Sequence, residues 1–144
     1  MAMFAKMMTA ALALMLVMAG AKAEDGALEA NRGSIVSVID DQLRAFKSDD
    51  AAKAFSHAAP NIRQLFSNPT TFMNMVRQGY QPVYRPRSYS FEELRMTQQG
   101  PAMRVQIVDD KGKVWSAIYT LEQQPDGEWL ITGCFLKEAP ELQT

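Results

Sequence analysis

Cysteine and histidine are nearly absent from this sequence, which has one of each, Cys134 and His57, among 144 residues. A single cysteine excludes an internal disulfide, so packing alone must hold the fold. One histidine and one cysteine, far apart in the chain, form no recognisable set of metal ligands. We therefore expect no metal site and no cofactor.

An excess of positive charge is also missing, because 15 Lys and Arg residues are balanced by 16 Asp and Glu residues. Nonspecific nucleic-acid binding requires net or clustered positive charge. The charge balance therefore predicts that nucleic acid is not a partner.

Long apolar runs are missing too. The longest one, residues 7–18, is shorter than the about 20 residues that a membrane-spanning helix needs. Lys6 precedes this run, and an Ala-Gly-Ala-Lys-Ala segment that ends at Ala23 follows it. A cationic head, a short apolar core and an Ala-x-Ala end are the three parts of a secretory signal peptide. We predict that residues 1–23 are a cleaved signal peptide and that the mature protein is periplasmic or secreted, with no membrane span.

The 121 residues that remain after cleavage suit a single domain. Residues 24–33 are polar and without a pattern, and we expect a flexible lead-in there. The domain itself is predicted at residues 34–138, followed by a tail at residues 139–144.

The first half of the domain has the periodicity of helices. Ser34 is a candidate N-cap. The apolar residues behind it recur at steps of three and four: Ile35, Val38, Ile39, Leu43 and Phe46. Asp49 and Asp50 resemble a pair of catalytic acids, but a short side-chain oxygen in front of Ala51 is better suited to capping the next helix. Pro60 then opens a further short helix.

Residues 66–84 connect this helical half to a half with strand patterns. Asn68-Pro69 has the form of an N-cap followed by proline at the first helical position. The helix is expected to end at Gly79 in the left-handed conformation. Residues 83–85 lie between two prolines and are expected to be extended.

Four strands are predicted after this connection. The first begins at Tyr89 and has a bulge at Glu92-Glu93, and the others cover residues 103–107, 114–121 and 129–136. Residues 109–112 and 125–127 form hairpin loops between them. A meander of this kind is antiparallel. The fold class is therefore α+β, with N-terminal helices packed on a curled four-stranded antiparallel sheet.

The last two strands are apolar in both phases. In the final one, Ile131 and Phe135 share one phase while Leu130 and Cys134 share the other. A half-solvated sheet would show polar residues on one side. We expect the helices to cover one face and a second copy of the chain to cover the other, which makes a homodimer through the sheet.

Two single residues have a functional and a structural interpretation. Cys134 lies in an apolar strand and is interpreted as a buried small hydrophobe, the alternative being a reactive or intermolecular thiol. His57 is the only side chain whose unperturbed pKa is near neutrality. Without an identified orienting partner or substrate, it is interpreted as solvated or structural.

Charge is distributed unevenly along the chain. Residues 24–50 carry seven acids and three bases, whereas residues 63–104 carry six arginines and two glutamates. Arginines close to Tyr80, Tyr84 and Tyr89 are suited to a carboxylate or phosphate, because guanidinium is a planar bidentate donor. The alternative is a solvated arginine face that balances the acidic first helix.

The order of helices, connection and antiparallel meander resembles the nuclear transport factor 2-like (cystatin-like cone) superfamily. More closely, the segments at residues 54–60, 72–84 and 129–134 resemble a family of small exported bacterial proteins known only as a domain of unknown function. The superfamily resemblance implies a cone-like fold. It includes ketosteroid isomerase-like and dehydratase-like enzymes as well as noncatalytic binding and dimerisation modules, so it does not decide the activity.

Three functions are consistent with these patterns. The first is a noncatalytic module that binds a small amphipathic or anionic ligand, or a protein partner. Its expected lining residues are Arg77, Tyr80, Tyr84, Trp115 and Tyr119. The second is an isomerase or hydratase that uses Asp109 or His57 as base and a tyrosine hydroxyl as acid. The third is a structural homodimer in an envelope assembly.

Overall fold

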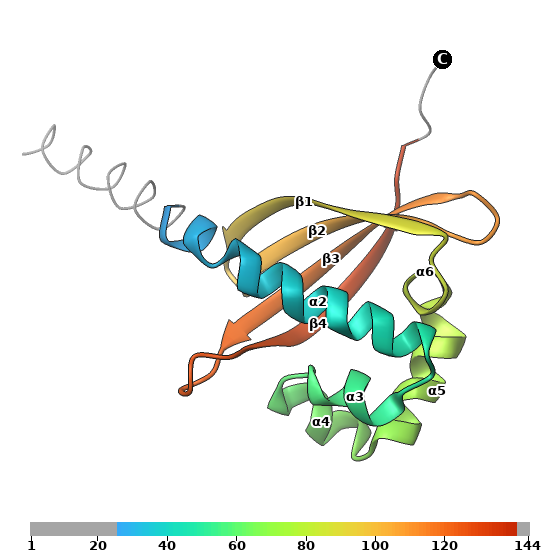
Figure 1. The fold of residues 1–144 in the computed structure, drawn as a ribbon, viewed down its shortest axis with the longest axis horizontal. Coiled ribbons are helices and arrows are strands. Elements are labelled where there is room, and N and C mark those ends of the chain that lie inside the picture. The colour runs from blue at the N-terminus through green and yellow to red at the C-terminus, as the bar shows by residue number, and fades with distance from the viewer. Residues whose placement is uncertain (1–25, 141–144) are drawn as a thin grey trace, which may run out of the picture.

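The computed structural model describes residues 26–140, which form helices packed on a four-stranded antiparallel sheet (Figure 1). The predicted signal peptide and the last four residues of the predicted tail lie outside this range. The elements are α2 (Arg32–Lys47), α3 (Ala51–Ser56), α4 (Pro60–Phe66), α5 (Pro69–Gly79), α6 (Gln81–Tyr84), β1 (Ser88–Thr97), β2 (Gly100–Val108), β3 (Val114–Gln123) and β4 (Trp129–Glu138). Within residues 26–140, no helix has the length and apolar character needed to cross a membrane.

Helix α2 lies across the sheet and buries the predicted apolar stripe, including Ile35, Ile39 and Phe46 (Figure 1). The chain before it differs from the prediction of a flexible lead-in, because residues 26–30 are helical and Leu28 is 4% exposed. Leu28 precedes Ile35 by seven residues and so lies on the same face of a continuing helical path. Since α2 begins at Arg32, Ser34 lies inside the helix and is not its N-cap.

Two of the predicted helix starts are confirmed. The Asn68 side chain accepts a hydrogen bond from the backbone N–H of Thr71 at 2.9 Å, and Pro69 is the first residue of α5. The Asp50 carboxylate caps α3 in the same way, accepting from the backbone N–H of Lys53 at 3.1 Å. Each cap satisfies one of the amides that a helix start leaves without a partner.

The segment after α5 differs from its prediction. Helix α5 does end at Gly79, but that residue does not have positive φ, and the chain turns at Tyr80 with φ −135°. Residues 81–84 then form the one-turn helix α6, not an extended segment. Pro82 fits there because a proline in the first helical turn lacks only an N–H that would have no partner.

The sheet has the predicted order β1-β2-β3-β4, with a bulge between Phe91 and Leu94. Gly112 and Gly127 have positive φ in the two hairpins that were predicted from the sequence. The curled, cone-like sheet was a wrong prediction, because the sheet is neither closed nor strongly curled. Closure would require β1 to pair with β4. The edge of β4 that does not pair with β3 instead forms hydrogen bonds with the α3–α4 connection. There Ile131 donates its N–H to the His57 carbonyl at 2.9 Å and accepts from the Ala59 N–H at 2.8 Å.

The two faces of the sheet differ in burial. Met103 and Tyr119 face the helices and are at most 1% exposed. Arg104, Ile118 and Phe135 pair across β2, β3 and β4 in the alternate phase, and Phe135 is 64% exposed. The face away from the helices is therefore mixed in character, and a homodimer through it stays a prediction.

Candidate functional site

A cavity of about 270 Å³ lies where α4, α5 and β4 meet. It is lined by Gln42 and Phe46 of α2, Asn61, Ile62, Leu65 and Phe66 of α4, Phe72, Met75 and Val76 of α5, Tyr80, Val83, Tyr119 of β3, and Ile131, Thr132, Gly133 and Cys134 of β4. None of these residues is charged. Leu65 is 74% exposed, so the cavity opens to solvent beside it.

Phenylalanine rings build one wall of this α4–α5–β4 cavity. The ring of Phe72 lies with its centroid 6.1 Å from that of Phe46, 5.5 Å from Phe55 and 5.7 Å from Phe66. These are the tilted arrangements that aromatic pairs prefer. Phe72 and Val76 are four residues apart in α5 and therefore lie on the same face of the helix, which lines the cavity.

Tyr119 supplies a buried polar atom to this wall. The residue is 1% exposed, and its hydroxyl has no nitrogen or oxygen partner among the described residues; only the Cys134 thiol, a weak partner, lies beside it. Burial raises the pKa of Tyr119 well above its usual value, so the hydroxyl keeps its proton. Leaving such a group unpaired costs about 1–3 kcal/mol. Buried tyrosines usually have a partner, so this hydroxyl needs an explanation.

Cys134 lies directly opposite Tyr119 across the β3–β4 pair and also lines the cavity. Burial raises the pKa of the Cys134 thiol to about 12, and the nearby Tyr119 hydroxyl offsets only part of this effect. The thiol is therefore neutral at pH 7 and a poor nucleophile, which favours the structural interpretation of this residue. The hydroxyl of Tyr80 is paired, because it donates to the Cys134 carbonyl at 3.2 Å.

The five predicted lining residues do not form one site. Tyr80 and Tyr119 line the cavity. Arg77 and Tyr84 belong to a separate polar cluster around an aspartate that the sequence analysis had assigned to capping. Trp115 lies at the β2–β3 hairpin.

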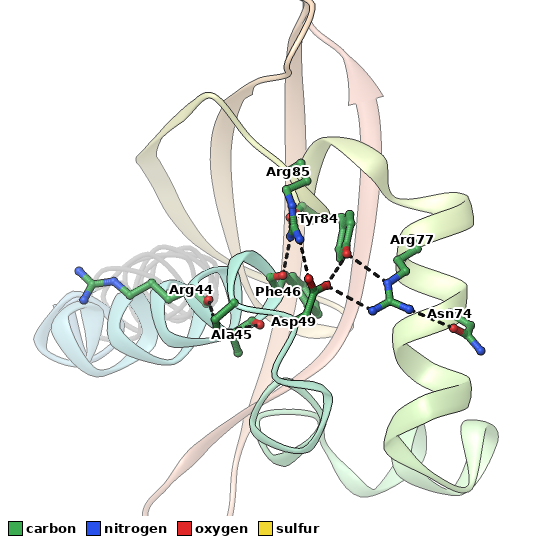
Figure 2. A network of polar contacts seen from close by, with 9 residues as sticks. Arg44, Ala45, Phe46, Asp49, Asn74, Arg77, Tyr84 and Arg85 are labelled. Carbon is green, nitrogen blue, oxygen red and sulfur yellow. Dashed lines mark hydrogen bonds and ion pairs between the residues drawn. The ribbon is translucent and has the colours of Figure 1, made fainter.

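This second group, which we call the Asp49 cluster, consists of Asp49, Arg77, Tyr84 and Arg85 (Figure 2). The Asp49 carboxylate accepts hydrogen bonds from Arg85 Nη2 at 2.9 Å, from Arg77 Nη2 at 3.3 Å and from the Tyr84 hydroxyl. Arg85 also donates to the Phe46 carbonyl at 2.6 Å and lies 4.0 Å above the Tyr84 ring. The Tyr84 hydrogen bond and the two arginines lower the pKa of Asp49. These contacts connect the α2–α3 loop, which carries Asp49, to α5 and to the end of α6.

The arginines of residues 63–104 are already bound within the chain. Arg63 donates to the Ala58 carbonyl, Arg77 and Arg85 to Asp49, Arg87 to the Asp110 carbonyl, and Arg95 and Arg104 to Glu93. Each of these guanidinium groups therefore has at least one partner inside the molecule. These contacts favour a structural role for the arginines over a grip on an external anion.

The two predicted base candidates lie apart from Tyr119. The Asp109 carboxylate accepts from Trp115 Nε1 at 3.0 Å and from the backbone N–H groups of Lys111 and Lys113 at 2.9 and 2.8 Å. The Trp115 hydrogen bond is the main reason that the pKa of Asp109 is lowered. These bonds hold the β2–β3 hairpin, and Asp109 does not line the cavity.

His57 lies in a different groove, together with Asp41 and Glu128. Its Nε2 atom is buried without a partner among the described residues, and burial lowers the pKa of the ring. His57 does not line the cavity either. Among residues 26–140, no group of three or more His, Cys, Asp or Glu side chains could hold a metal ion.

Comparison with known proteins gives a family without an activity. Residues 28–144 match the model of the family described as "Domain of unknown function (DUF4864)". The chain belongs to this family. No curated protein and no solved structure matches the chain. The expected membership in a family of unknown function is thus confirmed, while the link to the nuclear transport factor 2-like superfamily stays a prediction.

Proposed function

We propose that this DUF4864 protein is a noncatalytic module that binds a small amphipathic molecule in the α4–α5–β4 cavity. The observation that carries the proposal is the buried hydroxyl of Tyr119, which lacks a nitrogen or oxygen partner among residues 26–140 and lies in a wall that is otherwise mostly apolar. Ligand sites are typically apolar cavities with a few convergent polar groups. The predicted signal peptide at residues 1–23 leads us to propose that binding takes place in the periplasm or outside the cell.

The size of the cavity limits the ligand. A dry cavity of about 150 Å³ holds one benzene molecule. A cavity of about 270 Å³ therefore has room for a molecule roughly twice as large as benzene. This suits an aromatic ring or short acyl chain with one small polar group.

The proposal is for binding without catalysis because the cavity lacks a base beside Tyr119. A general base must be within hydrogen-bond reach of the proton that it removes. Asp109 is occupied in a hairpin and His57 lies in another groove, so neither supports the isomerase or hydratase alternative. Turnover of an enolisable ketone by the purified protein would favour that alternative.

A titration with butylbenzene, followed by the amide shifts of the purified protein, tests the proposal. We expect saturable shifts in residues that line the cavity. Ile62→Trp places an indole in the cavity and should abolish them, whereas Phe135→Ala on the other face of the sheet should leave them unchanged. If butylbenzene causes the same saturable amide shifts in the Ile62→Trp protein as in the original, the probe binds elsewhere.

A second candidate is the structural homodimer, for which the exposed Phe135 is the supporting observation. Phe135 lies opposite Ile118 in the β3–β4 register, and it is 64% exposed. Large exposed apolar residues on a sheet face are suited to a second protein surface. Light scattering should give the mass of a dimer for the original protein and of a monomer for Phe135→Arg. A monomer in both would exclude the dimer.

A further inference from the structure

We infer that the cavity selects an uncharged molecule with a hydrogen-bond acceptor, such as a ketone or ester, over a carboxylate or ammonium of the same skeleton. This inference rests on the proposed function and specifies the chemical class of the ligand. It follows from two properties of the cavity wall. No lining side chain is charged, and most of the polar side chains already have hydrogen-bond partners.

The first property excludes ions. No side chain that lines the cavity is charged. The sequence neighbour Arg77 follows the lining residue Val76, but its guanidinium points toward Asp49 and Tyr84 (Figure 2). Arg63 of α4 donates to the Ala58 carbonyl at 2.7 Å. An ion that enters an apolar site without a partner loses its hydration and gains little in return, which is far more costly than burying a neutral polar group.

The second property selects an acceptor. Four polar side chains of the wall already have partners. Tyr80 donates to the Cys134 carbonyl and Gln42 to the Ala54 carbonyl at 3.1 Å. Thr132 donates to the Thr120 hydroxyl at 2.8 Å, and Asn61 to the Thr132 carbonyl at 3.1 Å. The Tyr119 hydroxyl has no nitrogen or oxygen partner among the described residues, and the Cys134 thiol beside it is only a weak partner. The hydroxyl keeps its proton, and the neighbouring Cys134 thiol is a neutral, weak donor. A neutral oxygen acceptor is the group that completes this set.

A series of four molecules with one skeleton separates these properties. The series is 4-phenylbutan-2-one, 3-phenylpropanoate, 3-phenylpropylammonium and butylbenzene, titrated at pH 7 against the purified protein. We expect the ketone to bind at least tenfold more tightly than the carboxylate or the ammonium. A hydrogen bond of roughly 1–1.5 kcal/mol corresponds to a loss of about tenfold in ketone affinity for Tyr119→Phe, with unchanged affinity for butylbenzene. Tyr89→Phe is the matched control, because the Tyr89 hydroxyl donates to the Asp40 carboxylate at 2.5 Å and does not line the cavity.

Each outcome distinguishes this inference from the proposed function. If butylbenzene binds and the carboxylate binds as tightly as the ketone or more tightly, the inference is overturned and the binding function stays in place. The same conclusion would follow if Tyr119→Phe bound the ketone as tightly as the original protein. Failure of all four molecules to bind would overturn both. If Tyr119→Phe does not fold, the ratio of ketone to carboxylate affinity in the original protein decides the test.

Discussion

The Asp49 cluster and the α4–α5–β4 cavity share α5 and residues beside α6, yet they treat polar groups in opposite ways. In the cluster, a half-exposed carboxylate is bound by two guanidinium groups and a hydroxyl. In the cavity, the Tyr119 hydroxyl is buried and has no nitrogen or oxygen partner within the part of the chain that the structure describes. Neighbouring residues of α5 belong to different regions, since Val76 lines the cavity and Arg77 binds Asp49 in the cluster.

The two regions therefore differ in what they can offer a ligand. A cluster whose groups satisfy one another inside the molecule has little left to offer a ligand, and it serves to position helices. A buried group that is not satisfied costs stability, and such departures from local consistency are expected at functional sites. The cavity is therefore the stronger candidate site.

The largest effect is expected from breaking the cavity wall. Phe72→Ala removes a ring that is 5% exposed and packs against three other rings. It should lower the free energy of unfolding by about 3–5 kcal/mol, as measured by urea denaturation. Phe135→Ala, at a ring that is 64% exposed, is the control and should change it by less than about 0.5 kcal/mol. Similar losses for the two variants would show that Phe72 is not packed as described.

The reactivity of Cys134 tests whether the cavity side is desolvated. A pKa of about 12 leaves very little thiolate at pH 8, whereas a free cysteine has a pKa of about 8.5. We expect a disulfide reagent to label the folded protein at least about a hundredfold more slowly than the protein in urea. Addition of a cavity ligand should slow labelling further. Equal rates in the folded and unfolded protein would contradict the burial of the thiol.

Two tyrosine-to-phenylalanine changes compare an unpaired hydroxyl with a paired one. Tyr119→Phe removes a buried hydroxyl that has no nitrogen or oxygen partner among the described residues, and it should raise the free energy of unfolding by about 1 kcal/mol. Tyr80→Phe removes a hydrogen bond to the Cys134 carbonyl and should lower it by about 1 kcal/mol. Thermal unfolding of both variants provides the measurement. A loss of stability in Tyr119→Phe would show that its hydroxyl has a partner.

The smallest effect is expected from titrating the Asp49 cluster. The folded protein holds the pKa of Asp49 below its unfolded value, so the cluster adds stability above the unfolded pKa of about 3.9. This contribution is lost as the pH falls through the folded pKa. The difference in stability between the original protein and Asp49→Asn should therefore be present at pH 7 and disappear in acid. The effect of Tyr119→Phe should stay constant over the same range, because the pKa of Tyr119 is raised far above it. A pH-independent effect of Asp49→Asn would mean that its charge is not involved.

Features encoded by neighbouring residues were predictable from the sequence. The cap at Asn68, the bulge after Phe91 and the two hairpin glycines depend on residues within a few positions of one another, and the structure has all of them. The alternation that assigned Ile131 and Leu130 to different phases of the last strand is local in the same way. Leu28 was missed because a single apolar residue among polar ones carries no periodic signal until it is joined to Ile35.

Features that join distant residues could not be predicted in this way. Arg77 and Arg85 reach Asp49 from 28 and 36 positions away, and no local pattern pairs these residues. The aspartate was therefore interpreted as a helix cap, and Arg77 and Tyr84 were expected at the ligand. Sorting the cavity residues from the cluster residues required knowledge of which side of α5 and α6 faces β4. The turn at Tyr80, which sets that side, was predicted to lead into an extended segment.

A titration of 4-phenylbutan-2-one into isotope-labelled protein, with amide shifts recorded for both regions, tests most directly whether the cavity is the binding site. We expect saturable shifts at residues 131–134 and 62–66, which surround the cavity, and none of comparable size at Asp49 or Arg85. Saturable shifts centred on the Asp49 cluster, or no saturable shifts at all, would contradict binding in the cavity.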